Sequence, residues 1–257
     1  MTFELFISRR YFKSKPEKTI IAFITLLSIT GVAIGVTALI VVIAVMAGFE
    51  SDLKSRIMGI EPHLLIDQNR QPLRGYEKLT HLVDQTPGVR SAWPVVELQV
   101  MLRADSRIAG ALIKGVDPKA ADRGLKINAL NALLTVPGRA SSPKQPPPIV
   151  LGRDIARNLG LEKGDTLFVV SPSGTLSPAG FVPFMKRFMV AGFFETGMYE
   201  YDNGLAYINL EQAQILTRRR NSVSGIEVCL DNMFDTQAVA KKIQAAVREL
   251  LEGAAQE

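Results

Sequence analysis

The stretch that decides the fold is residues 19–48, TIIAFITLLSITGVAIGVTALIVVIAVMAG, which runs for thirty residues without a charged side chain. As an α-helix it would be ~45 Å long at about 1.5 Å per residue, against roughly 30 Å of bilayer hydrocarbon. A soluble core helix of this length would have to be buried on every side. The composition therefore predicts one transmembrane helix, 19–48, which can cross the bilayer tilted or project beyond the lipid.

Cationic residues are concentrated in the segment before this run. That segment carries +3 of the chain's formal net charge of +5, so the remainder is too weakly basic to indicate nucleic-acid binding. Because a cationic flank beside a span stays in the cytoplasm, we expect a cell inner-membrane protein with a cytoplasmic N-terminus and with residues after about 49 in the periplasm. The charged residues of the flank are Arg9, Arg10, Lys13, Lys15 and Lys18, opposed by Glu4 and Glu17.

A cleaved export signal is the alternative to an anchor. Residues 8–13, SRRYFK, resemble the twin-arginine export motif, and Val45 and Ala47 could precede a peptidase site. However, the apolar part of a signal runs for about 7–15 residues, and here apolar residues continue at helical spacing beyond the run. A peptidase cut would usually fall in an extended segment, so we favour a retained anchor. The residues beyond the run are Phe49, Leu53 and Ile57, on the same helix face as Met46 before them.

Two features near the N-terminus predict contacts within the membrane. Gly31 and Gly35 form a small-x-x-x-small pattern that lets a second helix approach closely, although glycine is also common in membrane helices generally. Residues 1–18 are amphipathic in outline, with aromatic side chains for lipid and cationic ones for headgroups. They predict an interfacial elbow helix on the cytoplasmic surface.

Residues 49–257 alternate between strand-like and helix-like patterns, which predicts an α+β periplasmic domain. The Pro- and Ser-rich stretch 139–148 predicts a linker, so we expect two subdomains, one from 49–140 and 222–257 and an inserted β-rich one, 141–221. The expected strands are 64–66, 89–96, 100–116 with a turn at 105–107, 149–151, 166–170, 186–194, 205–208 and 224–230, and the expected helices are 76–85, 154–159, 210–216 and 236–251.

The most informative connection is the segment 171–185, which is too long for a tight hairpin turn. It contains three prolines, which reduce the entropy that a loop loses when it docks. We expect it to expose Leu176, Phe181, Val182 and Phe184. A stiff apolar protrusion predicts a protein-binding element, and the alternative is a floppy connection or one that lies over its own domain.

Motifs for catalysis, cofactors and metals are missing from the sequence. It contains no Gly-x-x-x-x-Gly-Lys-Ser/Thr, His-Glu-x-x-His, Cys-x-x-Cys or Gly-x-Ser-x-Gly. The two histidines, His63 and His81, are expected to be structural or solvated, and the single Cys229 lies in an apolar stretch and is expected in the core. We therefore expect a protein that is not an enzyme, without cofactor or metal.

Several short motifs occur in the same order as in a known family. The motifs are 46–50 (MAGFE) with Leu53, 57–59 (IMG), Pro62-His63, 114–118 (KGVDP), 150–152 (VLG), 159–160 (LG), 164–165 (GD) and 221–226 (NSVSGI). By this ordered set the chain resembles the LolC/LolE lipoprotein-releasing permeases over essentially its whole length.

The resemblance implies a permease subunit of a type VII ABC transporter. Such permeases have four transmembrane helices, with a large MacB/FtsX-like periplasmic domain between the first and the second, so three more are expected beyond this region. The domain has a porter-like subdomain, here 49–140 with 222–257, and an inserted one. A separate cytoplasmic ATPase and a second permease, identical or different, complete the complex, which takes lipoproteins from the membrane lipid to a periplasmic carrier.

The resemblance also implies roles for particular residues. Pro178 stands at the proline of the hook that engages the carrier, and Lys186 stands at a basic position of the adjoining pad. The outer end of the first helix borders the lipoprotein path, which implicates Val42 and Met46. The full set expected to bind the carrier is Leu176, Pro178, Phe181, Val182, Pro183 and Lys186.

Other functions remain open at this point. An FtsX-like or MacB-like relative would signal across the membrane or serve an efflux pump, but it would lack the hook. A single-span anchored scaffold domain would need no membrane partner and would tolerate bulky residues at Gly31 and Gly35. Motifs of both the LolC and the LolE type occur, so the resemblance leaves the role within the dimer open.

Overall fold

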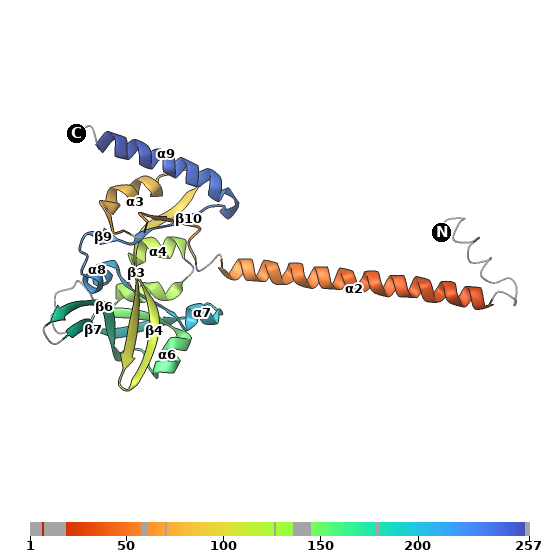
Figure 1. Cartoon of the computed structure of the whole chain (residues 1–257), viewed down its shortest axis with the longest axis horizontal. Coiled ribbons are helices and arrows are strands. Elements are labelled where there is room, and N and C mark those ends of the chain that lie inside the picture. Colours follow the sequence, from red (N-terminus) through yellow and green to blue (C-terminus); the bar gives the residue numbers. More distant parts are fainter. Residues whose placement is uncertain are drawn as a thin grey trace. The chain divides into compact units, whose positions relative to one another are not determined.

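The computed structural model describes residues 7, 19–57, 61–69, 71–125, 127–135, 145–177 and 180–254 (Figure 1). The chain divides into two compact units, Met1–Ser55 and Arg56–Glu257. The predicted elbow, 1–18, lies outside the described residues except for Ile7, as does most of the predicted linker, 139–148.

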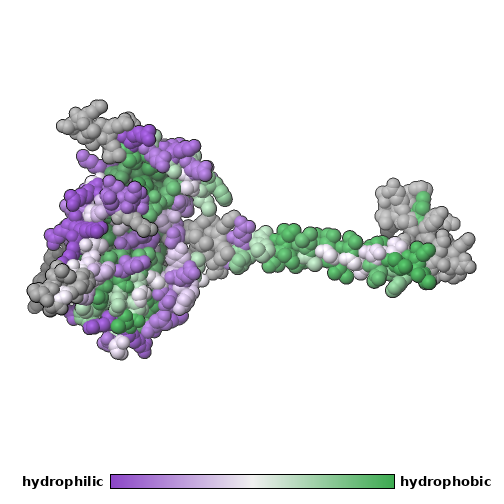
Figure 2. All heavy atoms as spheres, viewed as in Figure 1, coloured by the Kyte–Doolittle hydropathy of each residue, from purple (hydrophilic) through white to green (hydrophobic). Residues whose placement is uncertain are grey.

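The first unit is dominated by α2, a single helix over Thr19–Ile57. Its segment Ile20–Glu50 is long and apolar enough to cross a membrane, and no part of its most apolar window is buried (Figure 2). The hydroxyls of Thr25, Thr30 and Thr37 each donate to the carbonyl four residues earlier, at 2.7–2.8 Å, so the helix satisfies them internally. The predicted continuation of the helix beyond Gly48 is confirmed.

The second unit is built on an eight-stranded mixed sheet in the order β1-β10-β3-β4-β8-β5-β7-β6. Strand β6 also pairs with β3, so β3-β4-β8-β5-β7-β6 closes into a barrel, which removes the exposed edges of an open sheet. The strands are β1 Leu64–Asp67, β3 Val89–Ala104, β4 Arg107–Val116, β5 Pro148–Gly152, β6 Thr166–Ser177, β7 Gly180–Phe194, β8 Leu205–Asn209 and β10 Gly225–Leu230.

Helices cover this sheet, and a short two-stranded sheet of β2, Leu73–Arg74, with β9, Ser222–Val223, lies beside it. Helices α6 and α8 contribute side chains to the barrel core, whereas α3 and α9 pack on β10. The helices are α3 Tyr76–Asp84, α4 Pro118–Gly124, η2 Asn128–Asn131, α5 Ala132–Thr135, α6 Arg153–Leu159, α7 Tyr199–Asp202, α8 Leu210–Thr217, η3 Met233–Asp235 and α9 Thr236–Ala254.

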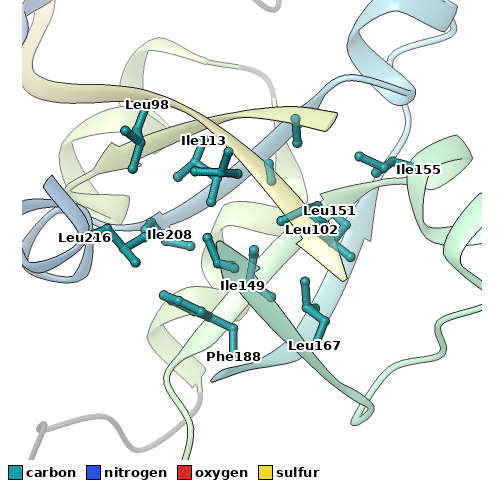
Figure 3. Packing of buried hydrophobic residues seen from close by; sticks show 14 of the residues in the cluster. Leu98, Leu102, Ile113, Ile149, Leu151, Ile155, Leu167, Phe188, Ile208 and Leu216 are labelled. Atoms are coloured by element: carbon teal, nitrogen blue, oxygen red, sulfur yellow. The ribbon is translucent and has the colours of Figure 1, made fainter. Parts of the chain in front are cut away.

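The barrel interior is a continuous apolar core (Figure 3). Because successive side chains of a strand point to opposite faces, alternate residues of each strand enter this core. Burial of their apolar area, at roughly 25 cal/mol per Å², is the main force that holds the strands together. The labelled members are Leu98, Leu102, Ile113, Ile149, Leu151, Ile155, Leu167, Phe188, Ile208 and Leu216.

One buried ionic cluster ties β10 to the barrel strands. The Lys114 ammonium lies 2.7 Å from Glu227 Oε1 and 3.3 Å from Glu97 Oε1, and the Trp93 indole donates to Glu227 Oε2 at 2.8 Å. Burial raises the pKa of Glu227, although the hydrogen bonds from Lys114 and Trp93 oppose that shift. Breaking such a cluster would leave a charge in a dry environment, so it fixes the register of β10 against β3.

The predicted α+β class, with one apolar helix at the N-terminus, is confirmed. The expected break between 96 and 100 is wrong, because β3 runs without interruption over Val89–Ala104; only the turn near 105–107 is real. The helices α4 and α5 were not expected. Strand β5, which belongs to the predicted inserted subdomain, pairs with β8 and β7 within the single eight-stranded sheet. The division into two subdomains stays a prediction.

Substitution of Gly115 tests how closely α8 approaches β4. A Cβ at Gly115 would overlap the Cβ of Ala213, so Gly115→Ala should lower the free energy of unfolding by about 1–3 kcal/mol. Gly110 in the same strand has open space around its Cβ position, so Gly110→Ala is the matched control. Urea unfolding of the full chain in detergent can be followed by fluorescence of the single, buried Trp93. Equal midpoints for the two variants would contradict this packing.

Removal of Lys114 tests the ionic cluster. Lys114→Met leaves the Glu227 carboxylate buried without its cation and should cost about 3–5 kcal/mol of stability at neutral pH. Because the pKa of Glu227 is raised, protonation of this carboxyl relieves the penalty, so the loss should shrink as the pH falls from neutral toward that pKa. The double variant Lys114→Met/Glu227→Gln should recover much of the loss. A loss that is independent of pH would argue against a buried ionised Glu227.

Candidate functional site

The predicted loop 171–185 is a two-stranded ribbon that extends the barrel strands β6 and β7 (Figure 1). Pairing continues past Ser171 and Phe184 to Ser177 and Gly180, which face each other across the ladder. The expectation that this segment is too long for a hairpin is therefore wrong. We call residues 171–185 the ribbon; Pro178 lies outside the described residues.

Prolines hid this ribbon from sequence analysis, because proline cannot donate to a sheet ladder. The structure accommodates two of them at an irregularity in the register. Between the Ser171–Phe184 pair and the Thr175–Val182 pair, residues 172–174 of β6 lie opposite Pro183 alone. A bulge of this kind needs no ladder hydrogen bond from Pro172 or Pro183, so strand pairing resumes beyond it.

Two polar contacts hold the base of the ribbon on α8. The Ser171 hydroxyl donates to the Leu216 carbonyl at 3.0 Å, and the Lys186 ammonium donates to Gln212 Oε1 at 2.5 Å. Burial lowers the pKa of Lys186, although the nearby Glu211 opposes that shift. The ammonium of Lys186, predicted to contact a partner, is thus already engaged within its own domain.

A third contact is aromatic. The Arg218 guanidinium lies over the Phe184 ring, with Cζ 5.4 Å from the ring centroid. Phe184 is half-buried and packs against the barrel core, so its predicted exposure is wrong. The reason is that α8 and Arg218, which follows it, cover the Phe184 side chain. This contact joins distant segments, so the local sequence does not predict it.

Two of the other predicted binding residues, Val182 and Pro183, are exposed near the tip of the ribbon. Val182 has 51% of its surface exposed, and Pro183 is also exposed. The backbones of Leu176 and Phe181 pair with each other near the tip. Because strand side chains alternate, Val182 shares the face of β7 that contacts α8, whereas Pro183 shares the opposite face with Met185.

That opposite face continues into an apolar patch that sequence analysis missed. Met101 of β3, Val170 of β6 and Met185 of β7 are neighbours across the three strands, and Met101 and Met185 are 47% and 42% exposed. Phe168 lies on the same face, with Arg103 5.5 Å from its ring centroid. We call Met101, Phe168, Val170 and Met185 the methionine patch. Alternation in β3 placed Met101 outward, but only the β3–β6 pairing brings it to the ribbon.

A groove of about 590 Å³ opens on the other side of the ribbon's base. Its walls come from β1, the middle of β3 and the segment around β9, and Ser173 of the ribbon also lines it. The lining mixes apolar and polar side chains and suits a binding surface better than a reaction chamber. The lining residues are Leu65, Asp67, Gln71, Pro72, 95–98, Ser173, Thr217, Arg219 and 222–224.

His63 and Cys229 contribute to the hydrogen bonding and packing of the domain. His63 accepts a hydrogen bond from the Leu230 backbone at Nδ1, 2.9 Å away, and burial and the nearby Arg90 lower its pKa. Burial raises the pKa of the Cys229 thiol to about 11, which suits the predicted core position. In the part of the chain that the structure describes, no three His, Cys, Asp or Glu side chains are grouped so as to hold a metal ion.

In α2, the four residues singled out by the sequence fall on one face. At 3.6 residues per turn, Gly31, Gly35, Val42 and Met46 lie within about 60° of one another around the helix axis. A Cβ at either glycine would meet nothing within 4 Å, and Val42 and Met46 are 58% and 61% exposed. This face is narrow and flat at the glycines and bulky at the other end.

Comparison with known proteins identifies a family and several relatives of this chain. Residues 25–246 match the family described as MacB-like periplasmic core domain. The chain is 34% identical to the lipoprotein-releasing system transmembrane protein LolC of Neisseria meningitidis serogroup B over 88% of its length, and 32% identical to that of Xylella fastidiosa strain 9a5c over 92%. It spans 54% and 56% of these relatives, about half of each. The periplasmic region of MacB from Actinobacillus actinomycetemcomitans superposes with a TM-score of 0.48 and 13% identity, covering 76% of this chain and 86% of that one.

Proposed function

From the premise that the chain belongs to the MacB-like periplasmic core domain family, and within it to the LolC/LolE family, we propose that it is a permease subunit that releases lipoproteins from the inner membrane. It passes them to a periplasmic carrier. The N-terminus lies in the cytoplasm, and residues after about 49 lie in the periplasm, as the cationic flank before the span favours. A separate ATPase subunit would supply the energy, as the resemblance to the LolC/LolE family implies.

The observation that carries this proposal is the anchored ribbon. Contacts of Ser171, Phe184 and Lys186 with α8 and its C-terminal residue hold the base, while Val182 and Pro183 remain exposed at the tip. A partner that binds a preorganised protrusion does not have to order it first, so more of the contact energy appears as affinity. The ribbon therefore supports docking of the carrier, with the methionine patch as an adjoining apolar surface.

The face of α2 supports the membrane part of the proposal. Gly31 and Gly35 let a helix of a second permease approach closely, which strengthens dispersion contacts in lipid. Val42 and Met46 continue the same face toward the periplasmic end, where they border the acyl chains of the lipoprotein. One face of one helix would thus serve both the subunit contact and the substrate path.

A charge at the ribbon tip tests carrier docking. Val182→Asp and Pro178→Ala in the full chain, in detergent, should each weaken binding of the LolA-type carrier, the former by roughly tenfold or more, because an apolar contact is lost or loosened. The unfolding midpoint should not change, since Val182 is exposed. Phe234→Asp is the matched control: it is 83% exposed in η3, outside the ribbon and the methionine patch. Surface-immobilised carrier measures the affinity, and wild-type affinity of Val182→Asp would refute ribbon docking.

A bulky residue at Gly35 tests the helix contact. Gly35→Leu should reduce co-purification with the partner permease several-fold, because the added side chain keeps the two helices apart. Ala33→Leu adds similar bulk on the opposite face of α2 and should leave co-purification unchanged. The measurement is pull-down of the tagged chain from detergent extracts. If both variants assemble normally, this face does not contact the partner.

A further inference from the structure

Four arginines converge beside the base of the ribbon. Arg74, Arg218, Arg219 and Arg220 line a cavity of about 350 Å³, together with Pro72 and Ser222. They come from two segments far apart in the sequence, β2 and the end of α8. Pairing of Arg74 with Ser222 in the β2–β9 ladder holds these segments together. We call these four residues the arginine cluster.

No carboxylate of the described part of the domain neutralises the charges of the arginine cluster. All four side chains are exposed, and none has a carboxylate within 4.0 Å among the residues that the structure describes. Like charges that converge raise the free energy of the unbound fold. The partial negative charge at the C-terminal end of α8 can account for one or two of these arginines. It does not account for Arg74, which comes from another segment.

The backbone at Arg218 is also unfavourable for this residue type. It has a φ of 57° at the C-cap of α8, a left-handed conformation in which glycine or asparagine is favoured. Arginine at this position places its guanidinium over Phe184 of the ribbon. The need to cap α8 therefore does not explain why residue 218 is an arginine. A need for a guanidinium group beside the ribbon does explain it.

The arginine cluster and the ribbon form one continuous surface. Arg218 contacts Phe184 of β7, and Arg219 lines the 590 Å³ groove that Ser173 of the ribbon also lines. Because the ribbon is anchored to α8 and the arginines follow α8 directly, the two keep a fixed spacing. A protein bound on the ribbon would lie against the arginine cluster.

We propose that the arginine cluster binds an acidic segment of the same periplasmic carrier that engages the ribbon, an inference that rests on the proposed function. Guanidinium groups form paired hydrogen bonds with carboxylates, and several of them in one cavity suit closely spaced Asp or Glu side chains. The cluster steers the carrier onto the ribbon and fixes its orientation, as complementary charges do at protein interfaces. Its continuity with the ribbon favours a protein partner over a lipid surface.

Charge reversal in the full chain, in detergent, tests this site. The double variant Arg219→Glu/Arg220→Glu should weaken binding of the LolA-type carrier by roughly tenfold, chiefly through a slower association rate, and should flatten its dependence on salt. Both side chains are exposed, so the unfolding midpoint should stay at the wild-type value. Lys241→Glu/Lys242→Glu on α9 makes the same change of charge at exposed positions away from the ribbon and should leave affinity nearly unchanged.

The outcomes separate this inference from the function on which it rests. If Val182→Asp weakens carrier binding while Arg219→Glu/Arg220→Glu keeps wild-type affinity and salt dependence, the arginine cluster does not bind the carrier although the ribbon does. If neither changes binding, both proposals fail. An equal loss in the α9 control would reduce the effect to net charge and overturn the site. A loss of binding to phosphatidylglycerol vesicles without a loss of carrier binding would assign the arginine cluster to a lipid surface instead.

Discussion

Strand β3 pairs with three different strands, and the arrangement of the globular unit depends on this sharing. Its first half, from Val89 to Val95, pairs with β10, whereas Met101–Arg103 near its end pair with β6 on that same edge. Its other edge carries β4 over Val95–Ala104. The strand therefore belongs both to the open sheet that packs under α3 and α9 and to the closed barrel. Between its two partners the same edge faces the groove.

This sharing determines where the candidate docking surface can be. The β3–β6 pairs close the barrel, and closure brings Met101 beside Val170 and Met185 on the outer face. The ribbon is then a continuation of barrel strands and inherits their rigidity, rather than being a free loop. Helix α8 fits closely against β4 at Gly115 and carries the residues that anchor the ribbon. The surface that we propose for the carrier thus has parts whose spacing is fixed before anything binds.

Two charged side chains inside the domain are paired with each other, whereas those of the arginine cluster, which we propose to bind another protein, are exposed. Lys114 and Glu227 are almost completely buried, but each is hydrogen-bonded, so neither is available to a ligand. The arginine cluster has the opposite character, with guanidinium groups that are exposed and grouped. Because buried charges cost free energy unless they are paired, Lys114 and Glu227 are committed to each other, whereas the exposed arginines are open to recognition.

Much of the fold could be predicted because its signals are local. The uncharged run from Thr19 to Gly48 specifies a membrane-length helix by composition alone. Strand-like patterns were recognised over most of β3, and the helix expected over 154–159 ends at Gly160, which has a left-handed conformation and follows α6. The failures occurred where a distant contact overrides the local signal. The proline-rich ribbon is paired on both sides of a bulge, and the bulge needs no ladder hydrogen bond from Pro172 or Pro183.

The sequence by itself determined the apolar helix, the order and type of most elements, and the candidate tip residues such as Val182, since each depends on spacing within one segment. Only the tertiary structure decided that Phe184 is half-covered, that Lys186 is engaged by Gln212, and that Arg74 joins the arginines after α8. The physical reason is that strand pairing and helix packing join residues far apart in the chain. Their free energy depends on complementary surfaces, which no periodicity within a single segment encodes.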